Sequence, residues 1–189
     1  FYVFSSHKIF GPTGSGVLYG KEHWLEELPP YQGGGDMVDQ VRFDGTTYNS
    51  LPFKFEAGTT HYAGAIGLAA ALTYVMDLGM KEIDAYEKEL IAYGKGLLEQ
   101  IPGLIFYGDA PDRIAVFSFL MEGIHAYDAG MILDKMGIAV RTGTHCTQPV
   151  MDHFGISGTI RASLVFYNTS EELDQLASGI ERTIQMLSS

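Results

Sequence analysis

The chain has 189 residues, of which 46% are hydrophobic, and its formal net charge is −11. This length favours one domain or two small ones with a real core. The acidic excess argues against nucleic acid or an anionic membrane as a partner. The single cysteine excludes an internal disulfide and is typical of a protein in the reducing cytoplasm. No secretory signal is expected, since residues 1–4 are too short for an apolar signal core and lack a basic leader.

The first twenty residues predict two strands joined by a turn that carries a lysine. Residues 1–4 are typical of a buried strand, Lys8 follows at the exit of that strand, and residues 17–19 predict a second strand. The glycines of residues 11–16 lack the spacing of a nucleotide-binding loop and lead into a strand, so they are interpreted as turn residues. Lysine forms Schiff bases with carbonyl cofactors, most often pyridoxal phosphate, although most lysines are solvated surface residues.

Residues 21–54 have a less regular pattern and predict a loop region rather than a linker. Its three glycines at 33–35 fit either close backbone approach across a subunit interface or a flexible loop. The uncharged stretch 57–76 is long enough to raise the question of a membrane span. It contains Thr59, Thr60 and His61 and is rich in Gly and Ala. It is therefore interpreted as a loop followed by a closely packed, buried helix.

The remainder of the chain predicts a compact α+β domain. Apolar residues recur every three or four positions over residues 80–101, which predicts an amphipathic helix that ends at Pro102. Thr169 and Glu172 have the spacing of a capping box at the start of a final helix. The other predicted elements are strands at 104–106, 114–120, 138–141 and 160–166 and a helix near 127–136.

The only cysteine, Cys146, is predicted to lie on a loop between a strand and a helix. Residues 138–140 are β-branched or apolar, and Pro149 suits a first helical turn. Loops held between rigid elements often carry reactive groups, and positive neighbours such as Arg141 or a protonated His145 favour a thiolate. The alternative is a cysteine that only fills apolar space.

Three further interpretations depend on polar residues between positions 145 and 161. A zinc site could draw on His145, Cys146 and two nearby residues, but no second cysteine exists, so no metal is predicted. A Cys-His-Asp hydrolase has the right residue types and no matching local signature. Arg161, early in a predicted strand, could bind a carboxylate through two parallel hydrogen bonds or form a surface ion pair.

Four segments together resemble one family. They are residues 1–19 (FYVFSSHKIFGPTGSGVLY), 55–72 (FEAGTTHYAGAIGLAAAL), 140–151 (VRTGTHCTQPVM) and 160–169 (IRASLVFYNT). The chain resembles the cysteine desulfurases of the SufS-like branch, which includes selenocysteine lyases, within the class V aminotransferases. The resemblance implies an α/β fold, the C-terminal part of a transferase that depends on pyridoxal 5′-phosphate (PLP).

The resemblance also implies two domains. Residues 1–79 would be the remainder of the large mixed-sheet cofactor domain with its connecting helix, and residues 80–189 the small C-terminal α+β domain with the cysteine loop. In the family the lysine motif lies near the middle of a longer chain, so this chain is expected to be the back half of a desulfurase. That half alone is expected to be inactive.

The resemblance assigns the cofactor residues. Lys8 would be the Schiff-base lysine, and Ser5 and His7 would lie near the cofactor phosphate. Thr59 would contact the phosphate in the neighbouring subunit, which implies a homodimer. Thr60 follows where the family usually has proline, which is a departure from its pattern.

The resemblance likewise assigns the residues that handle substrate. Arg161 would hold the carboxylate of L-cysteine, and Cys146 would take its sulfur as a persulfide, leaving alanine. Arg141 and His145 would tune the thiol or help an acceptor to dock. Thr144 stands where many relatives have a second histidine.

The implied partner is a sulfur-acceptor protein of the SufE or SufU type that serves iron–sulfur cluster assembly in the cytoplasm. Two alternatives stay open from the sequence. One is a selenocysteine lyase acting on L-selenocysteine. The other is a non-catalytic, dimerising domain that presents Cys146 without competent cofactor chemistry.

Overall fold

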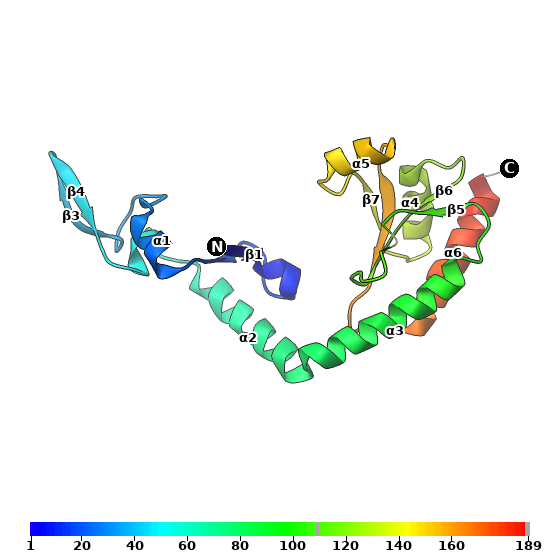
Figure 1. Ribbon diagram of the computed structural model, residues 1–189, viewed down its shortest axis with the longest axis horizontal. Helices are drawn as coiled ribbons and strands as arrows, with labels where there is room; N and C mark the ends of the chain where they lie inside the picture. Colours follow the sequence, from blue (N-terminus) through cyan, green and yellow to red (C-terminus); the bar gives the residue numbers. More distant parts are fainter. Residues whose placement is uncertain (109, 188–189) are drawn as a thin grey trace. The chain divides into compact units, whose positions relative to one another are not determined.

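The structure is a computed structural model that describes residues 1–108 and 110–187 (Figure 1). The chain divides into two compact units. The first spans Phe1–Gly79 and the second begins at Met80. No single helix among the described residues is long and apolar enough to cross a membrane, and the consecutive helices α2 (Tyr62–Leu78) and α3 (Met80–Leu98) reach that length only together.

The first unit begins with the predicted strand, turn and strand. Strand β1 (Tyr2–Ser5) pairs antiparallel with β2 (Gly16–Tyr19), and a 3-10 helix, η1 (Ser6–Ile9), carries Lys8 between them. Gly14 has φ +82°, as expected of a turn glycine. The prediction that residues 1–4 are buried is wrong for this unit. Phe1, Tyr2 and Val3 are 63–70% exposed, because β2 is the one strand paired with β1.

The region predicted as a loop contains regular structure. Helix α1 (Glu22–Glu27) is followed by the antiparallel hairpin of β3 (Val38–Arg42) and β4 (Gly45–Tyr48), and then by η2 (Phe53–Phe55). The two strands are short and their side chains are almost all exposed. They therefore lack the alternation of apolar and polar residues that identifies a strand in a sequence.

Helix α2 (Tyr62–Leu78) confirms the predicted helix, but most of it is exposed in this unit. Its buried residues are Gly64, Leu68 and Val75. Gly67 lies against Pro12, since a Cβ at Gly67 would be 2.5 Å from the Pro12 ring. The small residues of α2 thus let the helix approach the turn that follows Lys8.

The second unit has one four-stranded antiparallel sheet in the order β5-β6-β8-β7. Its strands are β5 (Leu104–Phe106), β6 (Val116–Met121), β7 (Arg141–Gly143) and β8 (Thr159–Ser163). Its helices are α3 (Met80–Leu98), α4 (Ala126–Lys135), the short α5 (Gln148–Phe154) and α6 (Ser170–Leu187). Helices α3 and α6 lie side by side (Figure 1).

The core of this unit lies between one face of the sheet and helices α3, α4 and α6. Strand β6 alternates, with Phe117, Phe119 and Met121 buried toward the helices. The buried cluster consists of Leu90, Leu98, Ile101, Ala115, Phe117, Phe119, Met121, Ala129, Leu133, Ile160, Ala162, Leu164, Leu173, Leu176 and Ile180. Burial of this cluster against three helices stabilises the sheet, and the loop with Cys146 follows strand β7 of that sheet.

Most predicted elements of this unit are confirmed, with shifted ends. Helix α3 ends at Leu98 rather than at residue 101, and the strand predicted at 138–141 is observed at Arg141–Gly143. The capping box is confirmed. The Thr169 backbone N–H donates to Glu172 Oε2 at 3.0 Å, and the Glu172 N–H donates to Thr169 Oγ1 at 3.4 Å.

Candidate functional site

The face of the sheet opposite the core carries polar side chains. Ile160 and Ala162 of β8 are buried in the core, so the alternating residues Thr159 and Arg161 lie on the other face. Arg161 pairs with Arg141 on β7 and with Ser118 on β6. Residues from three strands therefore gather on one surface.

Cys146 lies on the turn that leaves this surface, on a loop as predicted. Strand β7 ends at Gly143 and α5 begins at Gln148, with a proline in its first turn. The Thr147 backbone N–H donates to the Thr144 carbonyl at 2.9 Å, which closes a four-residue turn. His145 and Cys146 occupy its two central positions with φ of 54° and 64°.

Positive φ at both central positions is the signature of a type I′ turn, which normally uses Asn or Gly. Histidine and cysteine in this conformation cost about 1–2 kcal/mol each. Such strain persists where surrounding contacts hold it, and it concentrates at functional sites. The turn therefore needs anchors, and the structure provides two of them.

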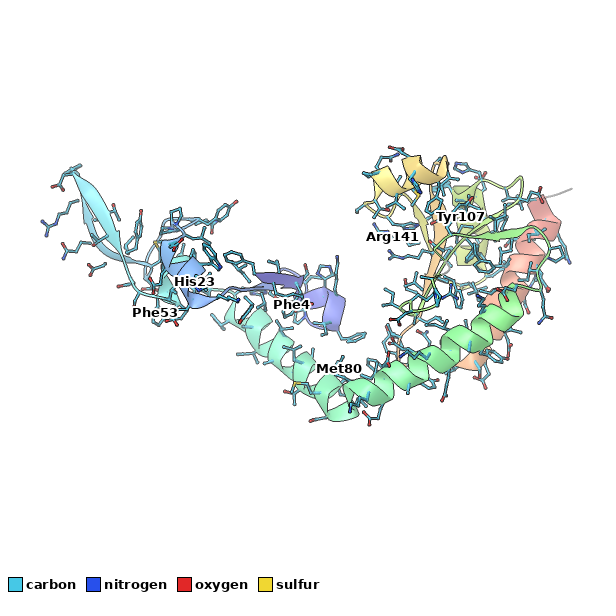
Figure 2. All side chains as sticks on the ribbon, in the orientation of Figure 1. Phe4, His23, Phe53, Met80, Tyr107 and Arg141 are labelled. Carbon is cyan, nitrogen blue, oxygen red and sulfur yellow. The ribbon has the colours of Figure 1, made fainter. Side chains whose placement is uncertain are left out.

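The first anchor is Arg141. Its Nη2 donates to the Cys146 sulfur at 3.6 Å, and Cys146 is exposed. The guanidinium of Arg141 thus lies within hydrogen-bond reach of the exposed sulfur. The exposure of Cys146 contradicts the alternative of an apolar filler. Figure 2 shows Arg141 on the side of the second unit where α5 lies.

The second anchor is the contact of His145 with Thr159. His145 Nε2 lies 3.1 Å from the Thr159 carbonyl oxygen and 3.0 Å from Thr159 Oγ1. A carbonyl only accepts, so this geometry assigns the proton of the neutral ring to Nε2. Burial lowers the pKa of His145, and the charges of Arg161 and Arg141 act in the same direction, while the bond to the Thr159 backbone opposes them. The ring is therefore held neutral.

Arg141 and Arg161 form a cationic pair without a carboxylate partner. Over residues 1–108 and 110–187, neither guanidinium forms an ion pair. The Nε of Arg161 is buried and has no hydrogen-bond partner in this part of the chain. Two guanidinium groups on adjacent strands with unused donors are suited to bind a small carboxylate.

Lys8 belongs to the first unit, where it is exposed on η1. A surface hollow of the same unit is lined by residues that include Ser5, His7 and Ser15, although Lys8 itself is not part of its lining. Ser15 Oγ is buried and lacks a partner among the described residues. Thr59 is exposed on the loop before α2 and does not line this hollow. Hydroxyl and imidazole donors around such a hollow are suited to an anionic group such as a phosphate.

In the part of the chain that the structure describes, no three His, Cys, Asp or Glu side chains gather into a metal site. Sequence reasoning missed Thr159 and Ser118, whose hydroxyls lie 3.0 Å apart beneath His145. Thr159 is fully buried. The alternation of Thr159 and Arg161 was the available signal, but strand pairing was needed to place Ser118 beside them.

Residues 1–176 match the family model described as aminotransferase class-V. The chain belongs to this family. The predicted family and the predicted α/β fold are thereby confirmed, since class V relatives of known structure superpose on nearly the whole chain. A cysteine desulfurase CsdA structure from Escherichia coli, in its S-sulfonic acid form, has a TM-score of 0.93 at 40% identity and covers 98% of this chain. The apo cysteine desulfurase of Thermococcus onnurineus has a TM-score of 0.92 at 37% identity and covers 98% of this chain.

Relatives identified by their sequences are also described as cysteine desulfurases. A cysteine desulfurase of Synechococcus elongatus is 52% identical over 181 residues, which are 96% of this chain and 29% of that protein. One of Pectobacterium carotovorum is 49% identical over 190 residues, which are 100% of this chain and 46% of that protein. This class V chain thus spans less than half the length of these relatives, and it covers 46% of the Escherichia coli structure.

Proposed function

We propose that the chain provides the cofactor lysine and the sulfur-accepting cysteine of a PLP-dependent cysteine desulfurase. The observation that carries this proposal is the exposed Cys146 beside Arg141, whose cross-strand partner is Arg161. The similarity to desulfurases over nearly all of the chain supports it. The substrate would be L-cysteine and the products alanine and protein-bound sulfur.

The residues around Lys8 fit the proposed cofactor. Lys8 would hold PLP covalently, and Ser5 and His7 would contact its phosphate. The Ser15 hydroxyl, which has no partner among the residues that the structure describes, would be available beside them. PLP, when bound, would supply an electron sink for the pair released at the α-carbon of an amino acid. A solved relative with 22% identity is described with glycine covalently linked to its PLP cofactor, which agrees with this chemistry.

Arg161 would hold the carboxylate of L-cysteine, and Arg141 would balance the charge of the thiolate. A planar guanidinium binds a carboxylate through two parallel bonds, which fixes the orientation of the amino acid as well as its position. The Nε of Arg161, which has no hydrogen-bond partner within residues 1–108 and 110–187, is available for such a bond. The neutral His145 would add no further positive charge.

The sulfur transfer proposed for Cys146 needs no oxidant or reductant other than L-cysteine itself. The Cys146 thiolate attacks the substrate sulfur, a sulfur–sulfur bond forms, and the carbon–sulfur bond of the substrate breaks. Cys146 becomes a persulfide, in which the transferred sulfur is oxidised. The substrate carbon is reduced and takes a proton, so the amino acid leaves as alanine.

The wider assignments follow from the same proposal. Residues 1–79 would belong to the cofactor domain and residues 80–189 to the small domain. Thr59, exposed and apart from the hollow, would serve the cofactor of a second subunit in a homodimer. An acceptor protein of the SufE or SufU type would take the sulfur for iron–sulfur assembly in the cytoplasm.

The test uses the complete natural polypeptide that contains these residues, incubated with PLP and L-cysteine. Borohydride reduction and peptide mass spectrometry should find the pyridoxyl group on Lys8, and alanine should be released. Lys8→Ala should abolish both signals, while Lys21→Ala, which removes an exposed lysine of the same unit, should preserve them. Alanine release that survives Lys8→Ala would contradict the proposal.

A further inference from the structure

The contact beneath the cysteine turn involves residues to which no role has been assigned. Thr159 is fully buried, and its hydroxyl lies 3.0 Å from both His145 Nε2 and Ser118 Oγ. With the Nε2 proton directed at Thr159, the hydroxyl of Thr159 is free to donate to Ser118. Three side chains from β6, β8 and the turn thus form one connected chain of hydrogen bonds.

The backbone around this contact is tightly constrained. Thr159 pairs with Gly143, the last residue of β7 before the turn. A Cβ on the neighbouring Gly158 would lie 2.7 Å from the Gly143 carbonyl carbon. The sheet edge can therefore shift little. The His145 ring connects this edge to the strained turn, in addition to the contact between Arg141 and Cys146.

We propose that Thr159 is a positioning residue for sulfur transfer. Its hydroxyl, held by Ser118, anchors the His145 ring, and this anchor keeps Cys146 at the tip of the type I′ turn beside Arg141. Without the anchor, the turn relaxes toward negative φ and the Cys146 sulfur moves away from the guanidinium. The inference rests on the proposed role of Cys146 and specifies how the fold keeps that thiol ready.

The test measures the reaction of Cys146 with a chromogenic aromatic disulfide. Cys146 is the only cysteine of these 189 residues, and the rate measured with Cys146→Ser is subtracted so that the difference reports on this turn. Thr159→Val, which keeps the shape and removes the hydroxyl, should lower the rate at neutral pH by about threefold or more. Thr159→Ser, which keeps the hydroxyl, should restore the rate to within about twofold of the original chain.

The salt dependence of the rate separates positioning from general stability. Salt screens the attraction between Arg141 and the thiolate, so the original chain should react more slowly as salt is added, and Thr159→Val should lose this dependence. If Thr159→Val melts earlier but keeps the original rate and salt dependence, Thr159 serves only the fold and the proposal is overturned. Equal rates for the Val and Ser variants would also overturn it.

A second variant covers the case in which Thr159→Val does not fold. Ser118→Ala leaves Thr159 in place and removes its partner, so a smaller loss of rate in the same direction is expected. An unchanged rate and salt dependence in Ser118→Ala would then contradict the proposal. Neither assay needs PLP or L-cysteine, so failure here is distinguishable from failure of the desulfurase assignment.

Discussion

Arg141 and Arg161 are direct partners across the β7–β8 ladder, so two guanidinium groups share one side of the sheet. Like charges placed opposite each other destabilise a sheet by roughly 0.2–1 kcal/mol. No carboxylate of residues 1–108 or 110–187 forms an ion pair with either arginine, although the chain carries a net charge of −11. The pairing of Arg141 with Arg161 therefore lowers the stability of the sheet and at the same time provides two positive groups that can bind an anion.

Removing one charge should therefore separate stability from activity. Arg141→Gln should leave the melting temperature unchanged or raise it, because the repulsion with Arg161 is relieved, while it slows Cys146 modification. Arg182→Gln, on α6, is the control for a general loss of charge. A large fall in the melting temperature of Arg141→Gln would contradict the view that the pairing of Arg141 with Arg161 costs stability and serves to bind an anion.

Arg161 should act on substrate binding through geometry as well as charge. Arg161→Lys keeps the charge and loses the two parallel hydrogen bonds, so the KM for L-cysteine should rise by about tenfold. Steady-state alanine release by the complete natural polypeptide measures this effect. An unchanged KM would indicate that a residue other than Arg161 binds the carboxylate of L-cysteine.

The stability of the second unit should depend on pH through His145. The folded-state pKa of His145 is lowered, so the unfolded chain binds the proton more readily than the folded chain does. The stability contribution is complete above the unfolded value of about 6.5 and is lost as pH falls from there through the folded pKa. His145→Gln should show a weaker loss of melting temperature over this range, whereas identical pH profiles would contradict the assigned burial effect.

Two glycines of α3 should respond in opposite ways to the same substitution. A Cβ at Gly94 would lie 2.9 Å from the Phe117 ring, whereas a Cβ at Gly96 would have no neighbouring atom within 4 Å outside the backbone of its own helix. Gly94→Ala should destabilise the unit by about 1–3 kcal/mol through overpacking. Gly96→Ala should stabilise it by about 0.5–1 kcal/mol, because alanine favours the helix. Urea unfolding of both variants measures the difference, and a loss of equal size in both would contradict the packing described for Phe117.

Local sequence patterns predicted what depends on local structure. The Cys146 loop, the capping box of Thr169 and Glu172, and the helix that begins at Met80 follow from spacing and capping rules. Cross-strand register was not predictable, because the pairing of Arg141 with Arg161 joins residues whose contact depends on the whole sheet.

Two other features were not predicted, for different reasons. The hairpin that begins at Val38 was predicted as loop, since its exposed strands carry no apolar alternation. The anchor of His145 on Thr159 was missed because it requires the distance between a turn and a neighbouring strand. The His145 anchor therefore depends on tertiary structure, whereas the hairpin is local and lacks only the apolar pattern that would identify it.

The most direct test of the desulfurase account is the mass of the peptide that contains Cys146 after the complete natural polypeptide reacts with PLP and L-cysteine. The account predicts a gain of one sulfur atom on Cys146, matched by one alanine per persulfide and absent from Lys8→Ala. Alanine release without added sulfur on Cys146, or persistence of the reaction in Cys146→Ser, would contradict it.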